Sequence, residues 1–295
     1  MALTKEQLAV VAEARTSSGG RLPAGVVARL VADGLPMAEL MLGLVPMAQK
    51  HAIPPISNFF VGAIALGESG ALYFGANYEF PGQALSFTVH AEQAVVTEAL
   101  GYDERGIRML AVSAPPCGYC RQFLNELTTA AELQILLPDK PAARLTDLLP
   151  NAFGPSDLGI ASGLMSPQDH QLVLVETLDP ASKPDADPLI AAALAAANKC
   201  YAPYSSSYAG VALRAKDGSI YSGSLAENAA FNPTMSPIEA AIVRLAIDGG
   251  HRYGDITDAV LVEVQGASVS QVAATRAVLS GISSVPLRVY DAVAG

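Results

Sequence analysis

Residues 54–79 read "PPISNFFVGAIALGESGALYFGANYE", and residues 202–227 read "APYSSSYAGVALRAKDGSIYSGSLAE". At a constant offset of 148, the two stretches share seven identical residues without a gap. The identical pairs are Pro55 and Pro203, Ser57 and Ser205, Gly62 and Gly210, Gly70 and Gly218, Tyr73 and Tyr221, Gly75 and Gly223, and Glu79 and Glu227. Such a series of ungapped identities is hard to obtain by chance and indicates an internal duplication.

Each copy has the pattern of a small α/β unit. Two apolar-rich stretches joined by a Gly-bearing turn predict a β-hairpin at its start. After the hairpins, the sequence predicts helices over residues 90–101, 117–129, 236–248 and 270–282, and strands over residues 108–114, 133–138, 259–264 and 286–292. Both copies therefore read β-β-α-β-α-β. Because strands separated by single helices need crossovers, the predicted fold class is α/β: a duplicated three-layer α-β-α sandwich with a mixed sheet, preceded by a small helical segment.

The composition is that of a globular chain with a large buried surface. Apolar residues make up 51% and charged residues 16% of the 295 residues, and the formal net charge is −10. Since no run of Lys and Arg is present, binding to nucleic-acid phosphates is disfavoured. The sequence shows no secretory leader and no apolar span of about 20 residues. We therefore expect a soluble, cytoplasmic protein that acts on a small ligand, with no nucleic-acid or membrane partner.

Metal-binding residue types gather in the first copy. The stretch "HAEQAVVTEAL" begins at His90, and "PCGYCRQFLNEL" contains Cys117 and Cys120. Imidazole nitrogen and thiolate sulfur are the donors that Zn²⁺ prefers, and helix N-termini favour the thiolate form. The pattern predicts one zinc ion per chain, held by these three side chains. The offset of 148 carries His90 on or near Ile238, in a stretch without His or Cys, so the second copy lacks the ligand set.

The fourth zinc position separates a structural site from a catalytic one. A structural zinc is closed by four protein ligands, whereas a catalytic zinc keeps a position for water. Cys200, His51, His170 and His251 are the spare candidates for a fourth ligand, but none stands at a motif-like spacing. We therefore favour the open site over the closed one. A redox-active CxxC pair is a further alternative, but it leaves the histidine unexplained.

Glu92 lies two residues after His90. Two helical positions turn by about 200°, so Glu92 cannot easily share the metal as a direct ligand. In the first turn of the helix its side chain can still reach a water on the metal, where a carboxylate takes a proton and delivers it elsewhere. An acid that only stabilises the helix N-terminus is the alternative. The combination H-x-E…P-C-x-x-C favours the catalytic role.

That combination is the zinc deaminase signature, a known motif. The chain resembles the long, two-copy form of cytidine deaminase over nearly its entire length, in the stretches "SNFFVGA", "FGANYEF", "TVHAEQAV", "PCGYCRQFLNEL", "LPNAFGPSDL", "PYSSS" and "AENAAFNPT". The resemblance implies hydrolytic deamination of cytidine and deoxycytidine to uridine and deoxyuridine, for pyrimidine salvage. A zinc-activated water would attack C4 of the base, and Glu92 would be the proton shuttle.

The duplication and the segments around it predict an organisation into four parts. We expect an N-terminal helical segment at 1–48, a catalytic zinc domain at 49–150, a connector at 151–187 and a degenerate domain without metal ligands at 188–295. The resemblance also implies that two chains form a homodimer in which the second half of one completes the active site of the other. Phe231 would then lie at the edge of the partner's pocket, although interface or core packing would explain this residue equally well.

Further site residues follow from the resemblance. Asn77 and Glu79 would bind the ribose hydroxyls, for which a buried amide and a buried carboxylate are suited. Without the family, the same pair reads equally as a strand-end turn with an exposed acid. Phe59 and Phe153 would pack against the base, although aromatic residues of this kind more often belong to the core. The backbone N–H of Ala91 would help to orient the base.

Two positions depart from the family pattern. A backbone carbonyl before the first cysteine would also orient the base, and this position falls on Pro115, where threonine is usual. Proline keeps the carbonyl but loses the side-chain hydroxyl. Phe60 stands where a polar residue is usual, and nothing in the sequence explains it.

Two other functions compete with this interpretation. A deaminase acting on bases in RNA or DNA shares the zinc signature, but it would need basic surface and access for a flanking strand. A non-enzymatic, zinc-stabilised interaction module would not need Glu92. The net charge of −10 argues against the first, and the H-x-E pattern argues against the second.

Overall fold

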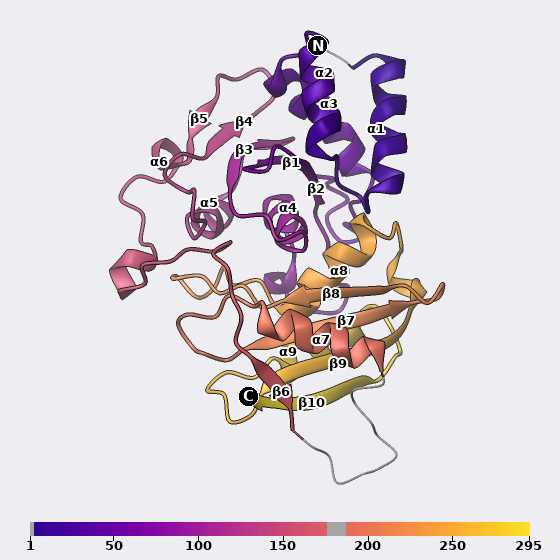
Figure 1. Cartoon of the computed structure of the whole chain (residues 1–295), viewed down its shortest axis with the longest axis vertical. Helices are drawn as coiled ribbons and strands as arrows, with labels where there is room; N and C mark the ends of the chain where they lie inside the picture. The colour runs from indigo at the N-terminus through magenta and orange to yellow at the C-terminus, as the bar shows by residue number, and fades with distance from the viewer. Residues whose placement is uncertain (1–2, 176–186) are drawn as a thin grey trace. The chain divides into compact units, whose positions relative to one another are not determined.

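Two units divide the chain in the computed structural model, which describes residues 3–175 and 187–295. One unit comprises Met1–Glu79 and Thr88–Ser166, and the other comprises Phe80–Phe87 and Pro167–Gly295. Each unit contains a five-stranded sheet with helices packed beside it (Figure 1). The domain boundaries expected at residues 48, 150 and 187 remain predictions.

The first unit contains most of the N-terminal half. Its helices are α1 (Lys5–Ser17), α2 (Ala24–Ala32), α3 (Met37–Gln49), α4 (Ala91–Leu100), α5 (Gly118–Leu124), α6 (Leu145–Leu148) and the 3₁₀ helix η2 (Pro155–Leu158). Its strands are β1 (Gly62–Gly67), β2 (Leu72–Ala76), β3 (Ile107–Val112), β4 (Gln134–Leu136) and β5 (Ala143–Arg144). The sheet order is β2-β1-β3-β4-β5.

The second unit repeats this plan. Its helices are α7 (Pro188–Asn198), α8 (Pro237–Ile247), α9 (Val272–Ser280) and the 3₁₀ helices η1 (Leu85–Phe87) and η4 (Tyr253–Asp255). Its strands are β6 (Leu172–Leu174), β7 (Ala209–Ala215), β8 (Ile220–Ser224), β9 (Ile256–Val264) and β10 (Leu287–Ala294), in the order β6-β10-β9-β7-β8. In both sheets three antiparallel strands are followed by a parallel neighbour, so the predicted mixed sheets and the duplication are confirmed.

Glycines show that helices cover both faces of each sheet. Neighbouring residues of a strand point to opposite faces. Gly62 pairs with Ala76, whereas Gly75 pairs with the next residue of β1, so the two glycines face opposite sides. A Cβ on Gly62 would collide with α3, and a Cβ on Gly75 would collide with α4. The first unit is therefore a three-layer α-β-α sandwich, and β1 and β2 are buried throughout.

The same contacts recur in the second unit and include a helix before the hairpin. A Cβ on Gly210 would collide with α7, and a Cβ on Gly223 would collide with α8. Helices α3 and α7 therefore occupy equivalent places, and the repeated unit reads α-β-β-α-β-α-β. Helix α3 falls almost entirely in the helical segment expected at 1–48, but its place in the repeat was not predicted, and neither was α7. The two helices share the position but not the distinctive Gly and Pro residues that identify the hairpins.

The counterpart of His90 is Ser236 rather than Ile238. His90 is the N-cap of α4, and Ser236 is the N-cap of α8. Gly75 approaches Ala91 just as Gly223 approaches Pro237, so the offset between the two helices is 146. The loop before α8 is thus two residues shorter than the loop before α4, and Ile238 replaces Glu92.

A buried carboxyl group in α8 predicts pH-dependent stability. Glu239 is 6% exposed, and burial raises its pKa from 4.5 to about 7 although Ser236 donates hydrogen bonds to it. A folded-state pKa above the unfolded value means that stability falls as the pH rises from about 4.5 to about 7. The complete loss corresponds to roughly 3 kcal/mol.

Replacement of Glu239 by Gln is expected to remove this loss. The first unit carries Gln93 at the equivalent position, where it accepts a bond from the N-cap N–H in the same way. In urea unfolding of the full chain, the free energy of unfolding of the variant relative to wild type should rise by about 2 kcal/mol between pH 5.5 and pH 8. Asp291→Asn, at an exposed carboxylate of the same unit, serves as the control. Parallel pH profiles for wild type and Glu239→Gln would contradict the prediction.

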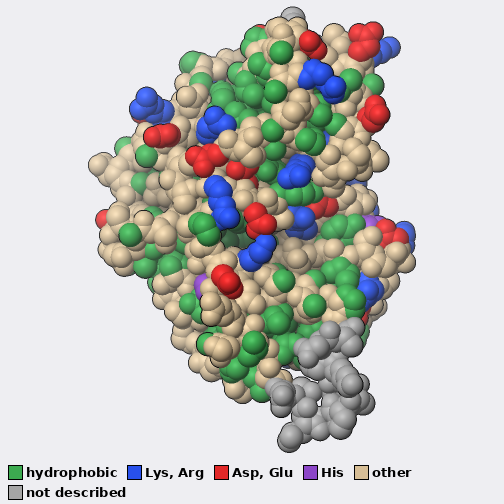
Figure 2. All heavy atoms as spheres, viewed as in Figure 1, with side chains coloured by type: hydrophobic (Ala, Val, Ile, Leu, Met, Phe, Trp, Pro, Cys, Tyr) green, Lys and Arg blue, Asp and Glu red, His purple; other side chains and the backbone are tan. Residues whose placement is uncertain are grey.

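Surface features agree with the composition. In the part of the chain that is described, no helix combines the length and apolar character needed to cross a membrane. Figure 2 shows one face of the molecule, on which Lys and Arg side chains lie interspersed with Asp, Glu and apolar side chains.

Candidate active site

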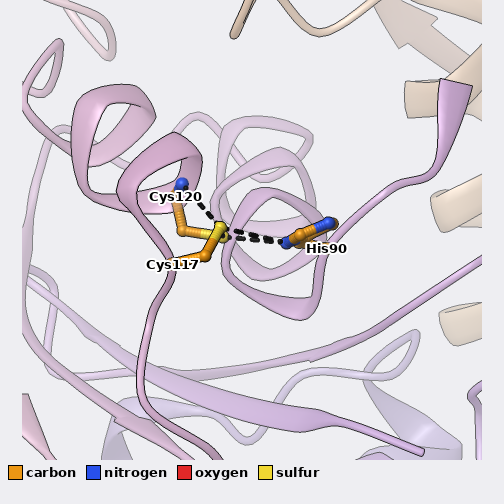
Figure 3. Close-up of side chains that lie close together, drawn as sticks. All are labelled: His90, Cys117 and Cys120. Atoms are coloured by element: carbon orange, nitrogen blue, oxygen red, sulfur yellow. Dashed lines mark hydrogen bonds between the residues drawn. The ribbon is translucent and has the colours of Figure 1, made fainter. Parts of the chain in front are cut away.

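Three side chains converge between the N-termini of α4 and α5 (Figure 3). His90 caps α4, Cys117 caps α5, and Cys120 lies in the first turn of α5. His90 Nδ1 lies 3.1 Å from Cys120 Sγ and 3.6 Å from Cys117 Sγ, and the two sulfurs are 3.4 Å apart. Tetrahedral zinc would place such donors roughly 3.5–3.8 Å apart, within about half an ångström of these distances. The donor types and their spacing therefore fit zinc.

The candidate metal site offers three protein ligands. Among residues 3–175 and 187–295, the cluster with metal-ligand spacing contains His90, Cys117 and Cys120 and no fourth His, Cys, Asp or Glu. His51, one of the spare candidates, lies 3.2 Å from the guanidinium of Arg15. This arrangement matches a catalytic zinc site, in which a position stays available for water.

Glu92 lies beside the cluster, in the first turn of α4. Its side chain is 4% exposed, and this burial raises its pKa above the ordinary value, against the lowering effects of its own backbone N–H and of His90. A carboxyl group with a raised pKa holds a proton more readily than an exposed carboxyl group does. This is the property required of a proton shuttle.

The two thiols differ in their environments. A hydrogen bond from Cys120 and the proximity of His90 lower the pKa of Cys117 to about 5, against the opposing effect of burial. The same hydrogen bond and burial raise the pKa of Cys120. One thiolate is therefore formed readily before any metal is bound, and metal binding displaces the proton of the second.

A pocket of about 280 Å³ opens next to the ligands. This volume suits a small ligand. The residues around it are Ser57, Phe59, Val61, Asn77, Glu79, Thr88, His90, Ala91, Glu92, Ala114, Pro115 and Cys117. Among these described lining residues the acids are Glu79 and Glu92, and there is no Lys or Arg. The pocket therefore offers no cation to a phosphate group.

Asn77, which directly follows β2, is hydrogen-bonded to the backbone of residues 59–61 at the pocket rim. Its Oδ1 accepts a hydrogen bond from the Val61 N–H at 2.9 Å, and its Nδ2 donates to the Phe59 carbonyl at 2.8 Å. A carboxamide has two donor hydrogens and two acceptor lone pairs, so one of each remains beyond these two bonds. Asn77 thus fixes the segment that carries Phe59, in addition to the ribose contact expected from the sequence.

Glu79 is held by the chain that precedes β1. Its Oε2 accepts from the N–H groups of Ile56 and Ser57 at 2.7 and 2.9 Å, and its Oε1 accepts from Ser57 Oγ at 2.5 Å. Burial raises the pKa of Glu79, but these hydrogen bonds outweigh it and lower the pKa below its ordinary value. Glu79 is therefore a fixed carboxylate at neutral pH.

The second unit retains this carboxylate network without the metal ligands. Glu227 accepts from the N–H groups of Tyr204 and Ser205 at 2.9 and 3.2 Å, and from the Ser205 hydroxyl. The residue at the place of Asn77 is Leu225. Hence the serine–glutamate network also has a structural role, whereas the asparagine distinguishes the copy that holds the metal ligands.

Most of the predicted site residues meet in this pocket. Those that line it are Phe59, Asn77, Glu79, His90, Ala91, Glu92, Pro115 and Cys117, with Cys120 buried beside them. Phe153 is not among the described lining residues: its ring is 46% exposed, and its carbonyl accepts from Gln122 and Asn125 at 2.8 and 3.1 Å. Phe231 belongs to the second unit and is 64% exposed.

Four lining residues were missed by sequence reasoning. Ser57, Val61, Thr88 and Ala114 contribute small or neutral side chains that carry no catalytic signature. Ser57 had a usable signal, because it is one of the seven residues shared by the two copies. The other three could be found only from the folded chain.

An open His-Cys-Cys site with a buried glutamate beside a small pocket defines a zinc enzyme that activates water. Two family models, both described as the cytidine and deoxycytidylate deaminase zinc-binding region, match the chain, one at residues 37–135 and the other at residues 145–276. The chain belongs to this family.

Relatives match over most of their length. A cytidine deaminase of Aeromonas hydrophila subsp. hydrophila is 48% identical over 272 residues, which are 92% of this chain and 89% of the relative. The cytidine deaminase of Photorhabdus laumondii subsp. laumondii is 47% identical over 243 residues, covering 82% of this chain and 79% of the relative. That of Vibrio atlanticus is 42% identical over 254 residues, covering 86% and 83%.

Proposed function

We propose that this chain is a zinc-dependent hydrolase that converts cytidine and deoxycytidine to uridine and deoxyuridine and releases ammonia. The observation that carries the proposal is the meeting of three metal ligands, His90, Cys117 and Cys120, with the buried Glu92 at one small pocket. The family membership and the named relatives support the same reaction.

Glu92 is the residue that moves protons. When bound, zinc supplies a Lewis acid that makes water a nucleophile at neutral pH. As a carboxylate, Glu92 takes one proton from the attacking water and delivers it to N3 of the pyrimidine. It then takes the second proton, from the hydroxyl now on C4, and delivers it to the amino group, which leaves as ammonia while C4 becomes a carbonyl. Its burial supports both steps, because the raised pKa lets the protonated form persist between them.

Neutral groups around the pocket orient the nucleoside. The N–H of Ala91, at the first residue of α4, donates to the base, and the carbonyl of Pro115 accepts from it. Phe59 packs against the base at the rim, where its side chain is 60% exposed in the ligand-free chain. Asn77 and Glu79 bind the ribose hydroxyls, which need both a donor and an acceptor.

The charge of the lining favours a nucleoside over a nucleotide or a nucleic acid. The described lining residues include two carboxylates and no cation that could pair with a phosphate. Incubation of the zinc-loaded protein with cytidine, deoxycytidine, cytidine monophosphate and a cytosine-containing oligonucleotide tests this. We expect the two nucleosides to be deaminated and the phosphorylated compounds to react far more slowly. Conversion of the oligonucleotide alone would reject the proposal in favour of a nucleic-acid deaminase.

Glu79→Gln is expected to raise KM for cytidine by about 10- to 100-fold, because it removes a charged acceptor for the ribose hydroxyl. The matched control is Glu227→Gln, which alters the same hydrogen-bond network in the copy without metal ligands. Both variants should lose similar stability in urea unfolding, but the control should keep a wild-type KM. Equal KM values for the two variants would remove Glu79 from the substrate site.

We also propose that the protein acts as a cytoplasmic homodimer in pyrimidine salvage. Phe153 and Phe231 are large apolar side chains with exposed rings. Contact with a second chain in a dimer would bury this apolar surface. In that assembly Phe153 packs against the base, and Phe231 lies at the edge of the partner's pocket. Sedimentation at micromolar concentration is expected to give the mass of two chains, and a monomer with full activity would exclude this part of the proposal.

A further inference from the structure

The two copies differ in where their sheets end beside the pocket. Strand β3 covers six residues and β9 covers nine, although both begin at equivalent positions. In the second unit the pairing of β7 with β9 extends to Ala209 and Glu263. One position further, the Val264 N–H donates to the Tyr208 carbonyl at 2.9 Å.

In the first unit the corresponding bond cannot form. The last bond of this series joins the Ser113 N–H to the Gly62 carbonyl at 3.0 Å. If the register is continued two residues beyond Gly62 and Ser113, Phe60 pairs with Pro115, just as Tyr208 pairs with Val264 in the second unit. Proline has no N–H to donate. The sheet therefore opens at this point, and Val61, Ala114 and Pro115 become part of the pocket lining.

A side chain of α3 donates a hydrogen bond to the Phe60 carbonyl, which has no donor from the neighbouring strand. Gln49 Nε2 donates to the Phe60 carbonyl at 2.9 Å. At the equivalent place of α7 the second unit has Ala197, since Gly62 approaches Gln49 as Gly210 approaches Ala197. The carboxamide is thus present in the copy where the strand donor is missing, and absent in the copy where that donor is present.

The turn before this segment is the same in both copies. Asn58 has φ 53° and Ser206 has φ 54°, and both therefore adopt the left-handed conformation. The serine–glutamate network before the turn is also shared. On this side of the pocket the copies therefore differ after the turn, at residues 59–61, whose backbone is held by the side chains of Gln49 and Asn77 instead of by a neighbouring strand.

We propose that Gln49 is a positioning residue of the nucleoside pocket: its carboxamide holds the Phe60 carbonyl that Pro115 leaves without a strand donor, and so keeps Phe59 at the rim. This inference rests on the proposed function for its kinetic consequence. It also gives a role to one of the two departures noted in the sequence, because Pro115 has no N–H to donate to the Phe60 carbonyl. The side chain of Phe60 has no structural explanation, since any residue offers a carbonyl.

Gln49→Met tests this role, since methionine keeps the length of the side chain and the helix propensity but loses the donor. The zinc-loaded variant is expected to show a KM for cytidine raised by about 3- to 10-fold, the effect of one hydrogen bond, with kcat within about twofold. Hydrogen exchange of residues 58–62 should become about threefold faster or more. Residues 206–210 of the second unit, which lack this contact, should exchange as in the wild type.

A second variant tests the competition for the carbonyl. Pro115→Ala supplies an N–H at the place of Val264, so on this background Gln49→Met should accelerate exchange of residues 58–62 much less. Equal acceleration on both backgrounds, or unchanged exchange and KM in Gln49→Met alone, would overturn the proposal. Absence of cytidine turnover by the wild-type protein would instead count against the proposed function, and the exchange data would still decide whether Gln49 holds this segment.

Discussion

Replacement of Glu92 by Gln is expected to lower kcat for cytidine by on the order of 10³- to 10⁴-fold, with KM changed little. The amide keeps the size of the side chain and can still donate and accept hydrogen bonds, but it cannot take a proton from water and return it to the base. Glu92 is buried, so no solvent molecule can easily replace it as the shuttle.

Two measurements make this result specific to proton transfer. Zinc content should stay at about one ion per chain, because Glu92 lies outside the ligand group. Urea unfolding should show no loss of stability, since neutralising a buried carboxyl with a raised pKa removes a desolvation cost. Glu132→Gln, at an exposed acid of the same unit, is the control and should keep full activity. A Glu92→Gln protein with near-normal kcat would show that another group moves the protons.

Replacement of Cys117 by Ala is expected to abolish both zinc binding and turnover. Only two ligands would remain, and the thiolate that forms most readily would be lost, because Cys117 has its pKa lowered to about 5. Zinc per chain should fall from about one to less than about a tenth, and activity should fall by at least about 10³-fold.

Cys200 provides a matched control for this experiment. It is also a free cysteine, but unlike Cys117 it is buried, it lies in the second unit, and burial raises the pKa of its thiol. Cys200→Ala should therefore keep one zinc per chain and full kcat, with a stability loss of about 1 kcal/mol from the small cavity. If Cys117→Ala kept its zinc, or if both variants lost it, the assignment of the metal ligands would be wrong.

The duplication offers controls that a single-copy protein lacks. Features shared by the two copies, such as the bond between Ser57 and Glu79 and that between Ser205 and Glu227, are sufficient to build the turn before the first strand. Features present in one copy mark what the pocket requires beyond the fold. Asn77 and Gln49 belong to this second group, because Leu225 and Ala197 stand at their equivalent positions.

Local patterns in the sequence were enough to predict the candidate metal ligands and the β-β-α-β-α-β part of each repeat. His90, Cys117 and Cys120 lie at helix starts that the hydrophobic pattern predicts, and a helix start places its first residues in a known geometry. The two hairpins were found because turns need Gly at particular positions, and these glycines recur at a fixed offset. Both kinds of signal depend on neighbours within a few residues.

Contacts between distant residues were beyond such patterns. The sequence paired His90 with Ile238 because the offset of the hairpins was carried across a loop whose length differs by two residues between the copies. The approach of Gly75 to α4 and of Gly223 to α8 identifies Ser236 as the counterpart of His90. The raised pKa values of Glu92 and Glu239 depend on what covers them, which their spacing along the helix does not reveal.

By itself, the sequence determined that this protein is a duplicated α/β chain with the His-Cys-Cys set in one copy, because repeats, turns and helix starts are local features. The tertiary structure alone decided how the pocket is opened. The strand register, continued from the bond between Ser113 and Gly62, pairs Phe60 with Pro115, 55 positions away, and the Phe60 carbonyl accepts a hydrogen bond from Gln49 of the preceding helix. A backbone carbonyl accepts a hydrogen bond from a donor that the fold places within about 3 Å, and which donor lies there depends on how the strands and helices pack.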